Sequence, residues 1–154
     1  AVDVVRAGTA VHEEGLAAAV AAGALAIDAA EASARSYDLV VDGVVGTGTR
    51  GAPALRGVVR EVVAALLPAV REGRTRVVAV DLPSGLHPDD GTTADGLVLP
   101  ADVTVTFGAV KAGLVRAEGP RLAGCVVLAD IGIGAQLALV EPVGRASVSR
   151  VVIA

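Results

Sequence analysis

The sequence predicts a single α/β domain organised around a mainly parallel sheet. Short valine-rich runs accompany one long helical stripe, and four of the runs end in a charged residue close to glycine. Continuous apolar runs are typical of strands that a parallel sheet buries on both faces, and their alternation with a helix indicates an α/β fold. One domain, residues 1–154, is expected for a chain of 154 residues.

The first third of the chain predicts a strand, a helix and another strand. Residues 2–5 form a short apolar run, and residues 13 to about 30 predict a helix because Glu13 and Glu14 suit a helix N-terminus. Gly23 weakens that helix, so the segment is also compatible with a helix, a turn and a short strand. Residues 39–45 predict the next strand.

The clearest helix prediction covers residues 53–71. Pro53 lies near its start and Gly73 follows as a stop signal. Apolar residues recur at helical spacing between them, which indicates one buried face. They are Leu55, Val58, Val59, Val62, Val63, Leu66, Leu67 and Val70.

The second half predicts strands over residues 76–80, 101–107, 124–129 and 149–153, with a polar, turn-rich segment at 87–99. Between Gly85 and Gly124 no helical stripe is visible. A parallel sheet needs cover on both faces, and these helices are too few to supply it. We therefore expect the chain to begin partway into a larger domain.

Composition excludes several classes of function. One Phe, one Tyr and no Trp argue against binding bases by stacking, and a net charge of −4 argues against a nucleic-acid partner. The single Cys125 excludes a disulfide framework and favours a reducing, cytoplasmic location. The start is unlike a signal peptide, and the longest apolar run, residues 15–27, is too short to span a bilayer.

A glycine-rich loop follows Asp42. Its small residues let backbone N–H groups approach an anion, and it leads into the helix predicted at 53–71, whose N-terminus favours phosphate. It lacks the Gly-Lys-Ser/Thr ending of a Walker loop and the spacing of a dinucleotide fingerprint. An ordinary strand-to-helix turn is the alternative interpretation.

Oxygen-bearing side chains follow two of the predicted strands. Asp81 ends the run that begins at Val77, and it serves either as a turn cap or as a general acid or base in a partly desolvated crevice. Ser84 and Asp42 offer hard oxygen ligands suited to an alkali or alkaline-earth cation. Because the carboxyl ends of parallel strands share one edge, where open α/β sheets bind ligands, these groups predict one crevice.

Lys111, the only lysine, lies just beyond the strand predicted at 101–107. It is either a surface residue or a cation that neutralises a substrate oxygen or phosphate. Asp130 follows another strand, and we expect it to cap a turn. His12 and His87 lie far apart in loop-like sequence, so we expect surface positions and no metal site.

Four segments in order, VVDGVVGTGTRG, VVAVDLPSGLHPDDG, VTVTFGAVKAGL and VVLADIGIG, resemble the NAD(P)H-hydrate epimerase family, the YjeF N-terminal domain. The resemblance covers residues 38–134 and implies a Rossmann-like three-layer α/β/α sandwich. Members interconvert the R and S epimers of NADHX and NADPHX, the hydrated forms of the reduced nicotinamide cofactors. A dehydratase that uses ATP or ADP, separate or fused, then restores NAD(P)H from the S epimer.

The resemblance also implies roles for single residues. Asp42 and Ser84 correspond to ligands of a potassium ion, Asp81 to a substrate-binding and catalytic residue, and Lys111 to a second catalytic residue. The substrate's phosphate region would contact a loop that consists of Gly46, Thr47, Gly48, Thr49, Arg50, Gly51 and Ala52.

Two departures from the family pattern stand out. The family's first substrate loop, of the Asn-Asn-x-Gly-Asp-Gly type, is absent and would lie before Ala1. Ala112 replaces the usual proline after the lysine. We therefore expect an N-terminally incomplete domain, whose exposed apolar surface favours association, for example as a homodimer.

Three alternatives remain open at this point. One is a non-catalytic nucleotide-binding or scaffold module with the same fold, which would bind a dinucleotide without turnover. A second is a different Rossmann-like enzyme, such as a phosphosugar or nucleotide transferase, which would depend on Mg²⁺ rather than K⁺. A third is one part of a bifunctional epimerase–dehydratase.

Overall fold

The structure is a computed structural model that describes residues 1–7, 11–47 and 54–153. Within these ranges the strands are β1 (Asp3–Val5), β2 (Leu25–Ile27), β3 (Leu39–Asp42), β4 (Arg76–Val80), β5 (Val103–Phe107), β6 (Cys125–Asp130) and β7 (Arg150–Ile153). The helices are α1 (Glu13–Ala21), α2 (Ala29–Ser33), α3 (Gly57–Arg71), α4 (Gly119–Leu122) and α5 (Gly134–Leu137), with a 3₁₀ turn, η1 (Ala112–Val115).

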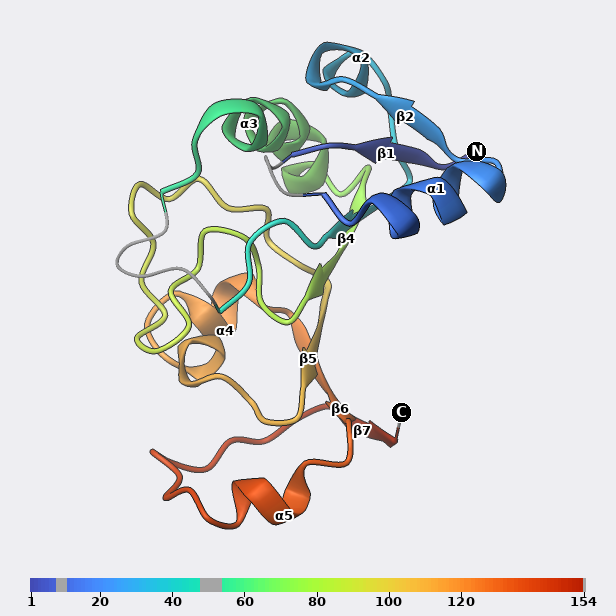
Figure 1. Cartoon of the computed structure of the whole chain (residues 1–154). Helices are drawn as coiled ribbons and strands as arrows, with labels where there is room; N and C mark the ends of the chain where they lie inside the picture. Colours follow the sequence, from blue (N-terminus) through green and yellow to red (C-terminus); the bar gives the residue numbers. More distant parts are fainter. Residues whose placement is uncertain (8–10, 48–53, 154) are drawn as a thin grey trace.

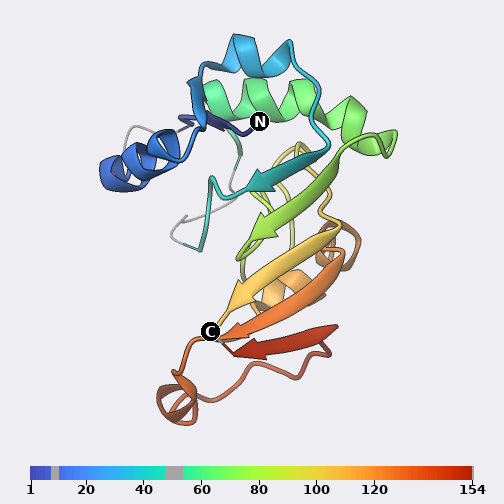
Figure 2. The same cartoon turned by 90° about the vertical axis from the view of Figure 1, so that its right-hand side faces the viewer.

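Two parallel sheets organise the molecule. Strands β3 to β7 pair in sequence order, each parallel to the next, and their arrows point one way (Figure 2). Strands β1 and β2 form a separate parallel pair near the N-terminus (Figure 1). The predicted α/β class with a parallel sheet is thus confirmed.

The core lies on one face of the five-stranded sheet. Helix α3 buries Val59, Val63, Leu66 and Leu67 against Val77 and Ala79 of β4. A second cluster joins Leu82, Leu86, Leu114 and Leu122 to Val126 of β6. Because Ala79, Thr104 and Val126 are register partners, both clusters lie on the same face, beside α3 and α4 (Figure 1).

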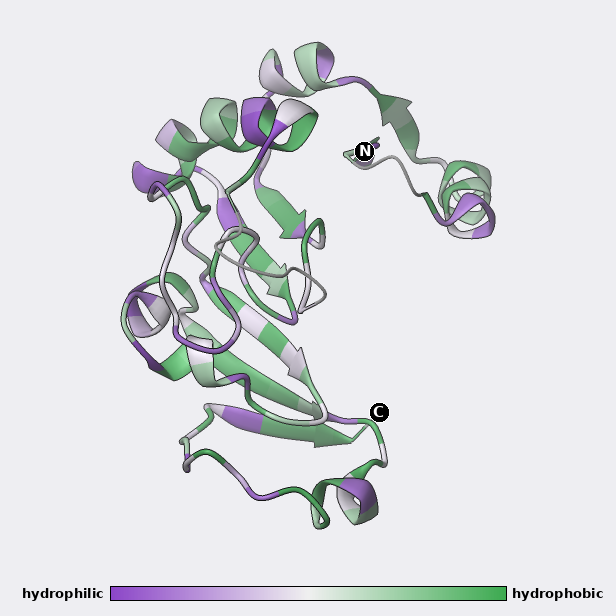
Figure 3. Ribbon diagram, turned by 60° about the vertical axis from the view of Figure 1, so that its left-hand side comes forward, coloured by the Kyte–Doolittle hydropathy of each residue, from purple (hydrophilic) through white to green (hydrophobic). Residues whose placement is uncertain are grey.

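The opposite face of the sheet is apolar and accessible to solvent. Leu39, Val41, Val80 and Phe107 share this face by register, and all four are exposed. Green colouring along most of the strand residues shows that the strands are largely apolar (Figure 3). In the described residues, therefore, the packed layer of helices covers one side of β3–β7.

A cleft of about 940 Å³ separates the two sheets. Residues of β1, β3 and α3 line it, and α2 packs against α3 at its rim (Figure 2). Asp3 stands in its wall, where one carboxylate oxygen accepts hydrogen bonds from Arg35 (2.9 Å) and Tyr37 (3.1 Å). Burial, then the bond to Asp3, raises the pKa of Tyr37.

Element boundaries differ from the sequence prediction in instructive places. Helix α3 begins at Gly57 rather than 53, because residues 54–56 are not helical and Leu55 is buried in the core ahead of the helix. The alternative for residues 13–30 is correct, since Gly23 adopts a φ of 97° between α1 and β2. Strand β3 ends at Asp42, three residues early.

Short helices account for the other differences. The segment between Gly85 and Gly124, which shows no helical stripe, contains η1 and α4. Each has only four residues, too few for a periodic apolar pattern to appear. Helix α5 is equally short and has no buried residue.

Candidate functional site

The carboxyl ends of β3, β4 and β5 place the predicted site residues along one edge of the sheet. Asp42 is the last residue of β3, Asp81 follows β4, and Lys111 lies four residues beyond β5. Parallel pairing explains this arrangement, because it aligns the ends of strands that are distant in sequence. The structure joins the predicted residues into two pairs, Asp42 with Ser84 and Asp81 with Lys111.

The first pair is buried. Asp42 is 3% exposed and Ser84 is 1% exposed. The Ser84 hydroxyl donates to Asp42 Oδ1 (2.6 Å), and the Ser84 backbone N–H donates to Asp42 Oδ2 (2.8 Å). The same hydroxyl accepts the backbone N–H of Val45 (3.0 Å). This network ties the end of β3, the start of the glycine loop and the turn after β4 together.

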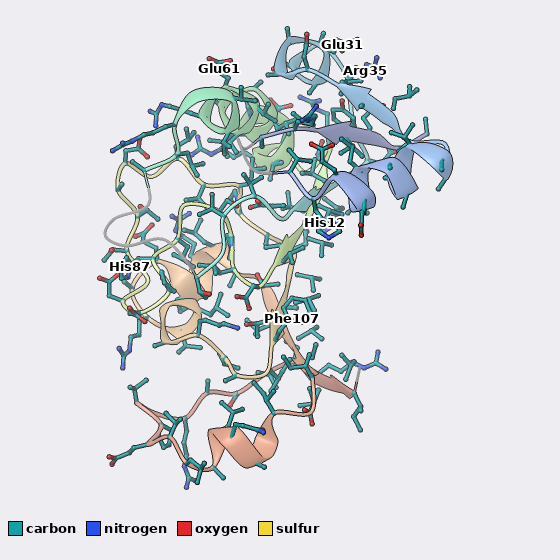
Figure 4. All side chains as sticks on the ribbon, in the orientation of Figure 1. His12, Glu31, Arg35, Glu61, His87 and Phe107 are labelled. Atoms are coloured by element: carbon teal, nitrogen blue, oxygen red, sulfur yellow. The ribbon has the colours of Figure 1, made fainter. Side chains whose placement is uncertain are left out.

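Oxygen atoms dominate this pair. A buried carboxylate and a hydroxyl are oxygen ligands that suit a hard cation. They do not suit a metal that prefers thiolate or imidazole ligands. Across residues 1–7, 11–47 and 54–153, no group of three His, Cys, Asp or Glu side chains could hold a metal ion. His12 is exposed, as predicted, but the prediction of a surface position for His87 is wrong, because its side chain is only 18% exposed and its Nδ1 lies 3.2 Å from Asp90 Oδ1. The two histidines lie far apart (Figure 4). These oxygen ligands are therefore compatible with an alkali or alkaline-earth cation that takes further ligands from elsewhere.

Asp81 adopts an unusual backbone conformation. Its φ of 71° lies in the left-handed region, which costs about 1–3 kcal/mol for a residue other than glycine and concentrates at functional sites. Its backbone N–H still donates to Val105 O (2.7 Å), which continues the β4–β5 ladder by one bond. The chain thus turns sharply at the strand end and presents the carboxylate beside β5.

The second pair is partly desolvated. Lys111 Nζ pairs with Asp81 Oδ1 and also donates to Phe107 O (2.9 Å). The two side chains are 20% and 19% exposed. The same carboxylate oxygen accepts the Thr106 hydroxyl (3.1 Å) and the Phe107 N–H (3.3 Å). Figure 4 labels Phe107, which marks the end of β5 at this site.

These contacts bear on the alternative interpretations of three residues. Lys111 is not a free surface lysine, because it is paired at the site. Asp81 is no simple turn cap, because its side-chain contacts come from β5 and the loop beyond it. Asp130 is a cap as expected, since Oδ1 accepts the Gly132 N–H (2.9 Å) and the residue is exposed.

The predicted phosphate loop is described only at its start. Gly46 and Thr47 follow the tethered Val45, whereas Gly48, Thr49, Arg50, Gly51 and Ala52 lie outside the described residues. Thr106 is the site residue that sequence reasoning missed. Its signal was a hydroxyl at the end of an apolar strand, which is ambiguous because threonine is also a common strand former.

Residues 4–113 match the family model described as YjeF-related protein N-terminus. The chain belongs to this family. The matched range includes both pairs of site residues, Asp42–Ser84 and Asp81–Lys111.

Curated relatives are similar over most of the chain. An NAD(P)H-hydrate epimerase of Microbacterium testaceum (strain StLB037) is 51% identical over 152 residues, which cover 97% of this chain and 58% of that protein. Another of Clavibacter michiganensis is 54% identical over 140 residues, covering 86% and 61% respectively. A bifunctional NAD(P)H-hydrate repair enzyme Nnr of Escherichia coli (strain K12) is 38% identical over 103 residues, 67% of this chain and 19% of that protein.

The chain therefore spans about three-fifths of the length of the two epimerases. None of the helices in the described ranges combines the length and the apolar character needed to cross a membrane.

Proposed function

We propose that this chain carries the site of an NAD(P)H-hydrate epimerase, an isomerase that interconverts the R and S epimers of NADHX and NADPHX. The observation that carries the proposal is the Asp81–Lys111 pair, a carboxylate and an ammonium group held together at the carboxyl ends of a parallel sheet, where such sheets bind ligands. The names of the relatives that are 51% and 54% identical support it.

A mechanism follows from the chemistry of the substrate. Its C6 carries a hydroxyl next to the ring nitrogen N1. Asp81 gives a proton to this hydroxyl while the N1 lone pair expels it, so the C6–O bond breaks, water leaves and Asp81 remains as a carboxylate beside Lys111. Water then attacks the opposite face of the planar iminium, and Asp81 takes back a proton from it. Such positioned proton transfer contributes about 10²–10⁴-fold in rate.

Partial burial makes the pair suited to this task. Both side chains are about four-fifths buried, so their mutual attraction is stronger than that of a surface ion pair. Lys111 keeps the carboxylate close to β5 and neutralises negative charge while the proton is away. The left-handed backbone at Asp81 fixes the direction from which the carboxylate approaches the substrate.

We further propose that Asp42 and Ser84 hold a potassium ion. The bound ion would supply positive charge beside a carboxylate that is 3% exposed. The residues themselves position the neighbouring loop, because Ser84 accepts the N–H of Val45 directly before Gly46. The loop from Gly46 to residue 52 would then contact the substrate's phosphates through backbone N–H groups.

The proposal extends to the surroundings of the reaction. A dehydratase that uses ADP or ATP would consume the S epimer, either as a separate protein or as a fused domain. We place the reaction in the cytoplasm, in line with the single cysteine, and expect a homodimer to cover part of the exposed apolar surface.

The decisive test is epimerisation of purified R-NADHX, scored with an S-specific dehydratase in the presence and absence of K⁺. It is run on this chain and on a hybrid that adds the part of the Microbacterium testaceum relative that the chain does not match. Acceleration above the spontaneous rate is expected, and Asp81→Asn should abolish it. Wild-type kcat in Asp81→Asn would refute the assignment. Dinucleotide binding without turnover in both forms would favour the non-catalytic module.

A further inference from the structure

All the hydrogen bonds on the Asp81 carboxylate gather on one oxygen. Oδ1 accepts from Thr106, from the Phe107 backbone and from Lys111. Among the described residues, no hydrogen bond ends on Oδ2. The two oxygens of this carboxylate therefore differ in their surroundings. The protein holds Oδ1, and Oδ2 is available to a ligand.

The three donors differ in rigidity. Lys111 has a flexible four-carbon stem with rotatable donors, so it can follow a carboxylate that moves. The Phe107 N–H lies 3.3 Å away, which is long for a hydrogen bond. Thr106 is β-branched, completely buried and paired with Leu128 of β6, so its hydroxyl cannot shift without distorting the sheet.

The Thr106 hydroxyl has only one good acceptor. It lies 3.1 Å from Asp81 Oδ1 and 3.5 Å from Ala109 O, the limit of hydrogen-bond distance. A hydroxyl has a single proton to donate, so the shorter contact takes it. The bond also joins β5 to the residue that follows β4, which resists rotation of the carboxylate about its own side-chain bonds.

We propose that Thr106 is a positioning residue, whose buried hydroxyl holds Asp81 Oδ1 so that Oδ2 exchanges the proton with the substrate hydroxyl. This role rests on the proposed epimerase function. Thr106 does not touch the reacting atoms, and it acts by fixing the direction of the second oxygen. Misplacing a catalytic group by small distances is costly in rate, which gives the bond its importance.

The test compares three variants in the wild-type background that shows epimerase activity. Thr106→Val keeps the shape and removes the hydroxyl, and Thr106→Ser restores it. Thr104→Val is the matched control, because Thr104 lies on the same strand and face, is equally buried, and donates instead to Ala123 O (2.7 Å). Each valine variant loses one hydrogen bond. Because the Thr106 hydroxyl donates to a carboxylate and the Thr104 hydroxyl to a neutral carbonyl, the urea midpoint of Thr106→Val should fall at least as far as that of Thr104→Val.

Activity should separate them. Thr106→Val should lower kcat about 10-fold or more with KM within about twofold, because the lost contact matters in the transition state. Thr106→Ser should recover most of kcat, and Thr104→Val should keep it. Wild-type kcat in Thr106→Val, an equal loss in Thr104→Val, or no rescue by serine would overturn the role of Thr106. A wild-type protein without epimerase activity would instead refute the proposed function, and this role with it.

Discussion

Replacing Ser84 by alanine tests whether the buried Asp42–Ser84 network stabilises the site. The substitution removes two hydrogen bonds, one to the Asp42 carboxylate (2.6 Å) and one from the Val45 N–H (3.0 Å). Asp42, only 3% exposed, would keep a single hydrogen-bond donor among the described residues, the backbone N–H of residue 84. The perturbation is therefore the loss of donors around a buried charge rather than the loss of packing.

The magnitude follows from the type of bond lost. A hydrogen bond to a charged group contributes about 1.5–3 kcal/mol, and a partly buried N–H left without a partner costs about 1 kcal/mol more. We expect Ser84→Ala to lower the free energy of unfolding by about 3 kcal/mol. Thr75→Val is the matched control: its hydroxyl is also buried but donates to the neutral carbonyl of Tyr37 (2.7 Å), so about 1 kcal/mol is expected.

Urea unfolding measures the free energy of unfolding of both variants. Choline chloride replaces potassium salts in the buffer, so that no potassium ion contributes to the stability of the Asp42–Ser84 network. A double-mutant cycle with Asp42→Ala completes the experiment, because groups in one network do not contribute additively. The double variant should be about 2 kcal/mol more stable than the sum of the single losses implies. Additive losses, or a Ser84→Ala value no larger than that of Thr75→Val, would refute the reasoning.

Three further predictions concern the Lys111 side chain, the two glycines Gly124 and Gly96, and the dependence of stability on pH. Lys111→Met should lower epimerase kcat about 100-fold with the fold intact by circular dichroism, and wild-type kcat would contradict its role. Gly124→Ala should cost at least about 3 kcal/mol in urea unfolding, because φ is 59° and the new Cβ would lie 2.3 Å from a backbone carbonyl oxygen. Gly96→Ala, with φ of 74° and open space, should cost about 1–2 kcal/mol, so equal losses would contradict the steric argument. The Val77 N–H and then Arg76 lower the pKa of Asp102. Its stabilisation is therefore present above the ordinary pKa of about 3.9 and lost as pH falls through the lower folded value, so Asp102→Asn and wild type should converge in acid unfolding. A stability difference independent of pH would contradict this.

The parallel sheet could be predicted because its strands are short, apolar and followed by glycine or a charge. The ends of elements were less predictable where two backbone conformations bury the same side chain. Leu55 fits the helical stripe of α3, yet the structure buries it from a non-helical segment before Gly57. The periodicity of one side chain cannot distinguish these placements, because both bury the same apolar surface.

The sequence predicts which residues form the site, but it does not predict which of them contact one another. Strand ends brought Asp42, Asp81 and Lys111 to one edge, as the parallel arrangement requires. Sequence spacing does not reveal that Ser84 serves Asp42, 42 residues away, with both its hydroxyl and its backbone N–H. Nor does it distinguish Thr106, which contacts Asp81, from Thr104, which contacts a backbone carbonyl.

Two carboxylates at opposite ends of the strands use their oxygens differently. At the amino ends of β4 and β5, Asp102 accepts the Val77 N–H (2.8 Å) with one oxygen and pairs with Arg76 through the other. Both oxygens of this carboxylate therefore hold β4 and β5 together. At the carboxyl ends, Asp81 accepts such hydrogen bonds with Oδ1 and leaves Oδ2 available to a ligand. A carboxylate satisfied on both oxygens has little to offer a substrate, and one satisfied on neither would not hold its direction. The half-satisfied Asp81 lies between these limits, which is why Thr106→Val should impair turnover while the pairing around Asp102 continues to hold the strands.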